Sequence, residues 1–199
     1  TFNVTTTCVA QSPTATISPA SQGAGATLPA TRAYTVTVTN RDSAACANGT
    51  FALASSLPAD WQGGFTTQNL SLAPGASGTA TLNVTAPVGT GAGSYPVSGG
   101  TVADANHSAA TAGGTFRIDL AAPSAPTNLR ASVKGTKVTL SWTVATDNGG
   151  SGVARYEIRR GTGITGTSTS TPYAESPASG TWTYTVVAVD GAGTNPAPR

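Results

Sequence analysis

The clearest pattern of hydrophobic and polar positions in this chain is a strict alternation. In residues 33–40, AYTVTVTN, the large apolar side chains Tyr34, Val36 and Val38 share one parity, and threonines take the other. A period of two places alternate side chains on opposite faces of a β-strand. The pattern therefore predicts a strand that turns these three residues toward a core and its threonines outward.

Similar segments recur along the whole chain, separated by glycine- and proline-rich turn signals such as LAPGAS and APVGTGAGS. No segment shows the apolar period of a long amphipathic helix. We therefore predict an all-β chain folded as two tandem Ig-like or fibronectin-like antiparallel β-sandwiches. The expected strands are 2–7, 14–18, 33–40, 49–55, 66–72, 78–85, 94–102, 111–119, 128–133, 137–142, 154–160 and 181–190, with a short serine- and threonine-rich stretch at 165–175.

One domain boundary stands out in the pattern. The alternating stretch TFRIDL is followed by AAPSAPTNL, in which Pro123 and Pro126 make a short, semi-stiff linker. We expect one sandwich in residues 1–121 and a second in residues 122–199. The second sandwich is one strand short of seven, because the strand in YTVVAVDGAGTN is followed only by Pro-Ala-Pro-Arg. We expect it to lack its full last strand, either because the chain was cut after Arg199 or because the tail forms a short irregular edge.

Composition narrows the function. The chain has 199 residues, 9% of them charged, and a net charge of +2. The electrostatic field of so small a charge is too weak to indicate nucleic acid or an anionic membrane as a partner. No apolar run approaches the roughly 20 residues of a membrane span. There is no methionine, so Thr1 is not a translation start and we expect a processed product or fragment.

The two cysteines, Cys8 and Cys46, admit two interpretations. In a cytosolic protein they would be buried thiols. In a weakly charged, threonine- and glycine-rich β chain we expect a disulfide instead, and with it secretion to an extracellular location. On the chain-entropy model such a loop contributes about 4 kcal/mol of stability. The bridge would attach an N-terminal strand to the loop that follows YTVTVTN.

Groups capable of catalysis at neutral pH are few. The chain has one histidine, His107, in the polar stretch DANHSAA, where we expect a solvated side chain. There is no His-Glu-x-x-His metal motif and no Gly-x-Ser-x-Gly elbow. The glycine-rich stretches lack the Gly-Lys-Ser/Thr of a phosphate loop. We therefore expect no catalytic residue and no required cofactor in this chain.

The second domain resembles a bacterial fibronectin type III module over about residues 124–195. The resemblance rests on PSAPTNLRAS, KVTLSW, DNGGSGVARYEIRR and TWTYTVVAVDGAGTN in this order. It implies a core that includes Trp142, Tyr156, Ile158, Trp182, Tyr184, Val186 and Ala188. The family usually has a tyrosine where Trp182 stands, with a hydroxyl that bonds back to the chain, so Trp182 implies a different hydrogen bond at this corner.

The first domain is similar, over about residues 12–120, to the Ig-like domains attached to secreted bacterial alpha-galactosidases and other hydrolases and proteases. The segments that carry this similarity are YTVTVTN, SSLPADWQ and LSLAPGASGTATLNVTAPVGTGAGSYPVSG. Trp61 in PADW is expected to pack over the end of the sandwich. The cysteine pair is not a general feature of that family.

Two weaker site hypotheses follow from these resemblances. In a fibronectin sandwich the chain entry and two of the loops share one pole, which would bring Asp119, Asp147 and Asp190 together as oxygen ligands for Ca²⁺ between the domains. The alternative is that the last two are ordinary turn residues. Aromatic residues available for binding an insoluble polysaccharide or fibrous protein are Trp61, Phe65, Tyr95 and Tyr173.

The leading functional hypothesis is a non-catalytic region of a secreted bacterial hydrolase or protease, which spaces or positions a catalytic domain of the same precursor. One alternative is a binding module for insoluble polysaccharide or protein fibre, which an exposed row of aromatic residues would favour. The other alternative is a segment of a surface adhesin. Because the hypothesis rests on family resemblance, it names neither the parent enzyme nor its substrate.

Overall fold

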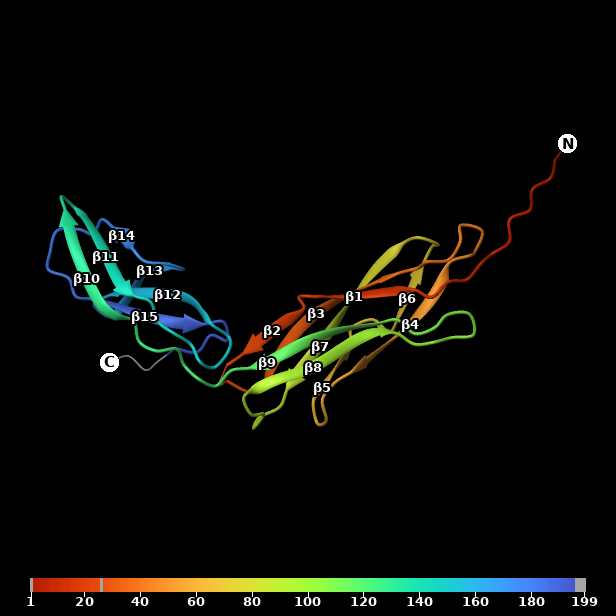
Figure 1. The fold of residues 1–199 in the computed structure, drawn as a ribbon, viewed down its shortest axis with the longest axis horizontal. Helices are drawn as coiled ribbons and strands as arrows, with labels where there is room; N and C mark the ends of the chain where they lie inside the picture. The colour runs from red at the N-terminus through yellow and green to blue at the C-terminus, as the bar shows by residue number, and fades with distance from the viewer. Residues whose placement is uncertain (1, 26, 196–199) are drawn as a thin grey trace. The chain divides into compact units, whose positions relative to one another are not determined.

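The computed structural model describes residues 2–25 and 27–195, and within these residues the regular structure consists of β-strands (Figure 1). The strands pair in antiparallel sheets that form sandwich-like layers, so the prediction of an all-β sandwich fold is confirmed. No helix among the described residues is long and apolar enough to cross a membrane.

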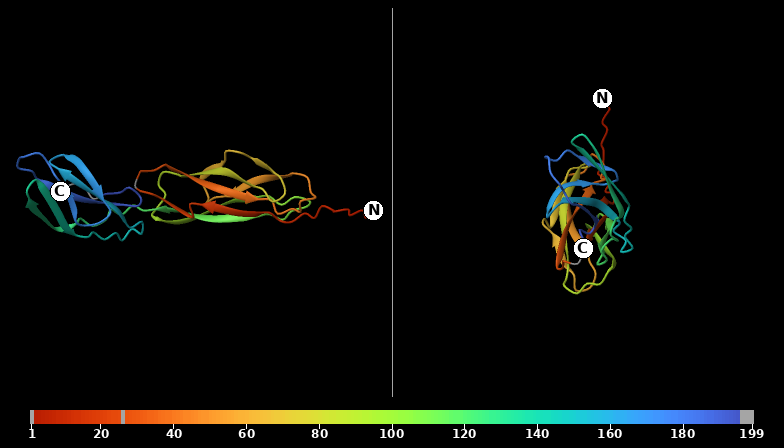
Figure 2. Two further views of the ribbon diagram at one scale, coloured as in Figure 1. Left: turned by 90° about the horizontal axis from the view of Figure 1, so that it is seen from above. Right: turned by 90° about the vertical axis from the view of Figure 1, so that its left-hand side faces the viewer.

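The chain forms two compact units. The N-terminal unit comprises Thr1–Gln22, Thr27–Thr90 and Ser94–Arg117, and the C-terminal unit comprises Gly23–Ala26, Gly91–Gly93 and Ile118–Arg199. Figure 2 shows the strands of both units from two further directions.

Two sheets build the N-terminal unit. The first sheet has the order β1 (Thr14–Ser18), β3 (Ala30–Thr39), β7 (Ser77–Ala86) and β5 (Gln62–Phe65). The second has the order β2 (Ser21–Ala24), β9 (Thr111–Ile118), β8 (Gly93–Thr101), β4 (Gly49–Ser56) and β6 (Asn69–Leu72). β2 and β9 each run into the C-terminal unit at one end.

The core of the N-terminal unit follows the alternation of β3. Tyr34, Val36 and Val38 are completely buried, and the intervening threonines lie on the outer face, as predicted. The Tyr34 hydroxyl donates a hydrogen bond to the carbonyl of Thr115 in β9, which joins the two sheets. Burial raises the pKa of this phenol to about 12, against the opposing charge of Arg32.

The expectation of a strand at residues 2–7 is wrong. Residues 2–13 carry no strand, and Phe2 and Val4 are 91% and 75% exposed. Alternation alone cannot make a strand when no sheet edge pairs with it. Sequence reasoning also missed β2 and β5, whose four residues each are too short to display a period.

The C-terminal unit contains two three-stranded sheets. Their orders are β10 (Thr127–Lys134), β11 (Lys137–Thr143), β14 (Tyr173–Glu175) and β13 (Gly163–Ser168), β12 (Val153–Arg160), β15 (Tyr184–Asp190). Trp142 and Tyr156 meet edge to face at 5.2 Å between ring centroids, and the Tyr156 hydroxyl accepts a hydrogen bond from the amide of Ala145. The buried cluster is Val138, Leu140, Trp142, Ala145, Tyr156, Ile158, Val186 and Ala188.

Trp182 is not part of this core, which corrects the expectation drawn from the fibronectin resemblance. β15 begins only at Tyr184, and Trp182 lies before it with 44% of its surface exposed. Its indole N–H donates to the carbonyl of Ala178 at 3.0 Å, and the guanidinium of Arg160 lies 4.8 Å from its ring centroid. Trp182 therefore makes a hydrogen bond back to the chain, but its side chain lies at the surface of the unit. The predicted lack of a last strand concerns residues 196–199, which lie outside the described residues.

Candidate functional site

Three carboxylates converge at one end of the C-terminal unit. Asp119 directly follows β9, Asp190 is the last residue of β15, and Asp147 lies in the loop between β11 and β12. One oxygen from each carboxylate lies within 4.8 Å of an oxygen of the other two. The structure therefore brings together the three aspartates that the sequence suggested as calcium ligands.

Backbone amides hold the carboxylates of Asp119 and Asp147. Asp119 accepts hydrogen bonds from the amides of Ala121 and Ser151, at 3.1 and 2.9 Å. Asp147 accepts from the amides of Gly149 and Gly152, at 2.9 and 2.6 Å. These bonds fold the loop around its own aspartate, which is how short polar side chains commonly organise turns.

The loop also depends on a glycine for space. A Cβ atom on Gly149 would overlap the carboxylate of Asp119. Glycine at this position is therefore required by the close approach of loop and carboxylate. The loop that carries Asp147 therefore packs directly against the carboxylate of Asp119.

Asp190 differs from the other two in its burial and its partners. It is 1% exposed; its Oδ1 accepts a hydrogen bond from the amide of Thr194 at 2.6 Å, and its Oδ2 has no hydrogen-bond partner among the residues that the structure describes. Burial raises the pKa of the Asp190 carboxyl, and the charges of Asp119 and Asp147 raise it further, against the opposing effect of the Thr194 hydrogen bond. The cluster offers hard oxygen ligands for a cation and no nucleophile or proton relay.

A second cluster surrounds His107, and no local pattern in the sequence indicates it. Nε2 of His107 lies 3.1 Å from Oδ1 of Asp42, and Nδ1 lies 2.9 Å from Oδ2 of Asp104. The ring also contacts Phe51, with centroids 5.2 Å apart. The imidazole is only 9% exposed, so the expectation of a solvated histidine is wrong.

Electrostatics favour the charged form of this histidine. The hydrogen bond to Asp104 raises the pKa of His107, burial opposes this, and the bond to Asp42 raises it again. The hydrogen bond from the Gln11 amide lowers the pKa of Asp42 most. Burial opposes this effect, and the hydrogen bond and charge of His107 lower the pKa further. Carboxylates face both ring nitrogens, so this environment favours the charged ring over the neutral form that a general base requires.

The aromatic candidates do not form a row. Trp61 and Tyr95 are half-buried and stack against each other at 4.9 Å, and Trp61 also meets Phe116 edge to face at 5.0 Å. Phe65 is 8% exposed and belongs to the core. Tyr173 belongs to the other unit, where it packs against the buried cluster. The structure thus pairs only two of the four candidates.

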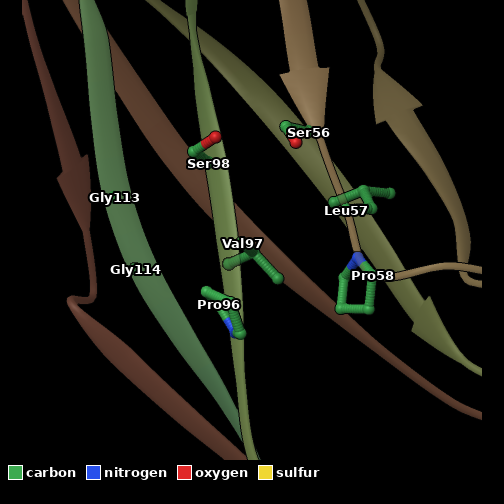
Figure 3. A pocket seen from close by; sticks show the side chains of 8 residues that line it. All are labelled: Ser56, Leu57, Pro58, Pro96, Val97, Ser98, Gly113 and Gly114. Carbon is green, nitrogen blue, oxygen red and sulfur yellow. The ribbon is translucent and has the colours of Figure 1, made fainter.

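A hollow on the N-terminal unit has a volume of about 290 Å³ (Figure 3). It lies between the end of β4 and the strands β8 and β9, and its lining is largely apolar. The lining residues are Ser56, Leu57, Pro58, Pro96, Val97, Ser98, Gly113 and Gly114. Two hydroxyl groups are the only polar side chains among them, so the hollow offers no acid, base or metal ligand.

Cys8 and Cys46 form a disulfide with an S–S distance of 2.07 Å. The amide of Ser43 donates to the carbonyl of Val9, and the amide of Val9 donates to the Ser43 hydroxyl. The bridge therefore attaches an extended, strandless segment to the loop after β3. Cys46 lies in the same loop as Asp42. The disulfide and the contact with His107 therefore attach this one loop to two other segments of the chain.

Comparison with known proteins finds a family match within the first domain. Residues 26–102 match a family model described as the NPCBM-associated, NEW3 domain of alpha-galactosidase. The resemblance to alpha-galactosidase-associated domains is confirmed. The NEW3-like segment includes β3 through β8 with the hydrogen-bonded pair β3 and β7 at its centre.

Curated relatives share a limited part of this chain. Exoglucanase A of Cellulomonas fimi is 46% identical over 95 residues, which is 46% of this chain and 11% of the exoglucanase. Chitinase A1 of Niallia circulans is 44% identical over 78 residues, 38% of this chain and 11% of the chitinase. Chitinase Chi52 of Paenibacillus xylanexedens is 45% identical over 84 residues, 41% of this chain and 16% of the chitinase. The chain spans only a small part of the length of the relatives it matches, which supports an accessory domain of hydrolases.

Proposed function

We propose that this chain is a non-catalytic region of a secreted bacterial hydrolase, and that it spaces or positions a catalytic domain of the same precursor. The observation that carries the proposal is the pattern of sequence sharing. Similar segments of 78 to 95 residues occur in enzymes named as exoglucanases and as chitinases. A module common to enzymes with different substrates has a role other than choosing the substrate.

The chemistry of the described acidic residues supports this role. A glycosidase needs two carboxyl groups about 5–5.5 or 6.5–9.5 Å apart across a substrate cleft. The aspartates at the end of the C-terminal unit are closer than this, and Asp119 and Asp190 are buried. Glu157 and Glu175 form ion pairs with arginines on β12. None of these groups is arranged for acid–base catalysis on a sugar.

The disulfide supports an extracellular location, because such bonds persist in oxidising compartments. The low charge content is in keeping with a partner other than nucleic acid or a membrane.

Two measurements test the proposal. The purified chain should release no reducing sugar from glucan or chitin, and it should stay in the supernatant when mixed with insoluble chitin, cellulose, xylan or collagen, with and without calcium. Sugar release would contradict the absence of catalysis. Retention on one polymer would replace the spacer role with a binding role, and Trp61→Ala and Tyr95→Ala variants would then locate the surface.

Deletion of this region from the full-length precursor tests the positioning role directly. We expect unchanged turnover of soluble oligosaccharides and slower degradation of insoluble polymer. Loss of turnover on the soluble substrate would show that the region takes part in catalysis. Equal rates on both substrates would show that positioning by this region contributes nothing.

A further inference from the structure

We propose that Asp119, Asp147 and Asp190 form a Ca²⁺-binding site of the C-terminal unit. The proposal goes beyond the accessory role and does not depend on it. Oxygen ligands bind Ca²⁺ at 2.3–2.6 Å, so two oxygens on opposite sides of one ion lie about 5 Å apart. The three carboxylate oxygens, within 4.8 Å of one another, fit around a single ion of this size.

The independent observation is an unpartnered acceptor inside the cluster. Asp190 is 1% exposed, and its Oδ2 has no hydrogen-bond partner among the described residues. Buried polar atoms without partners are rare, because each loses its interactions with water and gains nothing in return. A cation bound by the carboxylate supplies the missing partner directly.

A second buried oxygen without a partner belongs to a neighbouring residue. The hydroxyl of Thr194 has no hydrogen-bond partner among the described residues, and the amide of Thr194 donates to Oδ1 of Asp190. The oxygens of Asp190 and Thr194 are of the type that Ca²⁺ uses as a ligand, directly or through a water molecule.

The existing hydrogen bonds leave room for a metal ion. The amides that hold Asp119 and Asp147 orient their carboxylates, but each carboxylate oxygen has more than one lone pair. A carboxylate therefore accepts an N–H bond and binds an ion at the same time. The amide bonds act as the outer supports that fix ligand orientation around a metal.

Ligand chemistry selects the ion. Oxygen ligands without nitrogen or sulfur favour hard cations such as Ca²⁺ and Mg²⁺ over zinc or copper. Mg²⁺ requires near-ideal octahedral geometry at 2.0–2.1 Å, whereas Ca²⁺ accepts irregular sites. The carboxylates here come from a strand end, a loop and the residue after another strand, which makes an irregular set. This arrangement fits Ca²⁺ better.

The first experiment titrates the metal-free full chain with CaCl₂ to about 10 mM, above the 0.1–1 mM dissociation constants typical of extracellular modules. Backbone NMR should show saturable shifts of the Ser151, Gly152 and Thr194 amides, all of which donate to the three carboxylates. Calorimetry should show a melting temperature that rises by several degrees and returns with EDTA, because a ligand of the folded state stabilises it. No response at 10 mM would overturn the proposal.

The decisive variant is Asp190→Asn. A neutral amide is easier to bury than a charged carboxylate, so the metal-free variant should melt at or above the wild-type temperature. Its affinity for Ca²⁺ should fall at least tenfold. The matched control is Asp60→Asn, which removes one exposed carboxylate from the N-terminal unit and should leave calcium binding unchanged. Full calcium binding by Asp190→Asn, or an equal response of the wild-type chain to Mg²⁺, would overturn the assignment.

Discussion

Replacement of His107 by alanine tests the histidine cluster that joins two distant loops. The substitution removes the charge-assisted bond to the buried carboxylate of Asp42 and the ring contact with Phe51. Hydrogen bonds to charged groups contribute about 1.5–3 kcal/mol, and aromatic contacts about 0.5–1.5 kcal/mol. We exclude the bond to Asp104 from this sum because that side chain is 42% exposed. The expected loss is about 2–4.5 kcal/mol, or about 10–20 °C in the melting temperature of the N-terminal unit.

The loss should depend on pH in a defined direction. The pKa of His107 is raised in the folded chain, so its contribution is complete below the unfolded value of about 6.5 and disappears as the pH rises through the folded pKa. The pKa of Asp42 is lowered, so its contribution is present above about pH 4 and disappears as the pH falls through the folded pKa. The difference between wild type and variant should therefore be largest between about pH 4 and 6.5.

Urea unfolding at pH 5.5 and at a strongly alkaline pH measures this difference. His107→Phe is the matched control, because it keeps an aromatic ring beside Phe51 and removes both bonds to carboxylates. It should lose the pH dependence while retaining part of the packing. A wild-type-to-alanine difference that is equal at both pH values, or below about 1 kcal/mol at pH 5.5, would refute the reasoning.

Three further predictions concern other parts of the chain. Reduction of Cys8–Cys46, which closes a separation of 38 residues, should lower the stability of the N-terminal unit by up to about 4 kcal/mol in thermal melts with and without dithiothreitol; an unchanged melt would contradict this. Gly149→Ala forces a methyl group against the Asp119 carboxylate and should cost about 1–3 kcal/mol, measured by urea unfolding; wild-type stability would show that the loop yields freely. Tyr34 has its pKa raised to about 12, so stability should fall above pH 10, where the unfolded phenol ionises first. The ultraviolet titration of the Tyr34→Phe variant should lack the tyrosine ionisation near pH 12 that the wild type shows. An unchanged titration would refute the prediction.

Local patterns were sufficient for the parts of the fold where one strand face is buried. β3 could be predicted from its alternation because Val36 and its neighbours face a core along the whole strand. Trp142 was assigned to the core through the fibronectin resemblance and lies there. Residues 2–7 begin with a similar alternation at Phe2 and Val4, but pairing requires a neighbouring edge, and a sequence does not state which edges are available.

The parts that escaped prediction depend on distant contacts. His107 contacts Asp42 across 65 positions, and no local signal connects the two. Trp182 has the composition of a core residue, but its strand begins two residues later, and strand ends are the least regular part of a pattern. The aspartates of the C-terminal unit were proposed as a group from the order of loops in a fibronectin sandwich. The burial of Asp119 and Asp190 and the unpartnered oxygen of Asp190 became visible only in the structure.

The position of the disulfide has a mechanical consequence. Cys8 precedes β1, and Cys46 follows β3, so tension applied at the N-terminus crosses from one cysteine to the other and bypasses β1, β2 and β3. The 38-residue separation would otherwise extend by roughly 130 Å when pulled straight. Oxidised and reduced chains should therefore differ by about this length when a single molecule is stretched. In the spacer role proposed above, the bridge would limit how far this region lengthens under load.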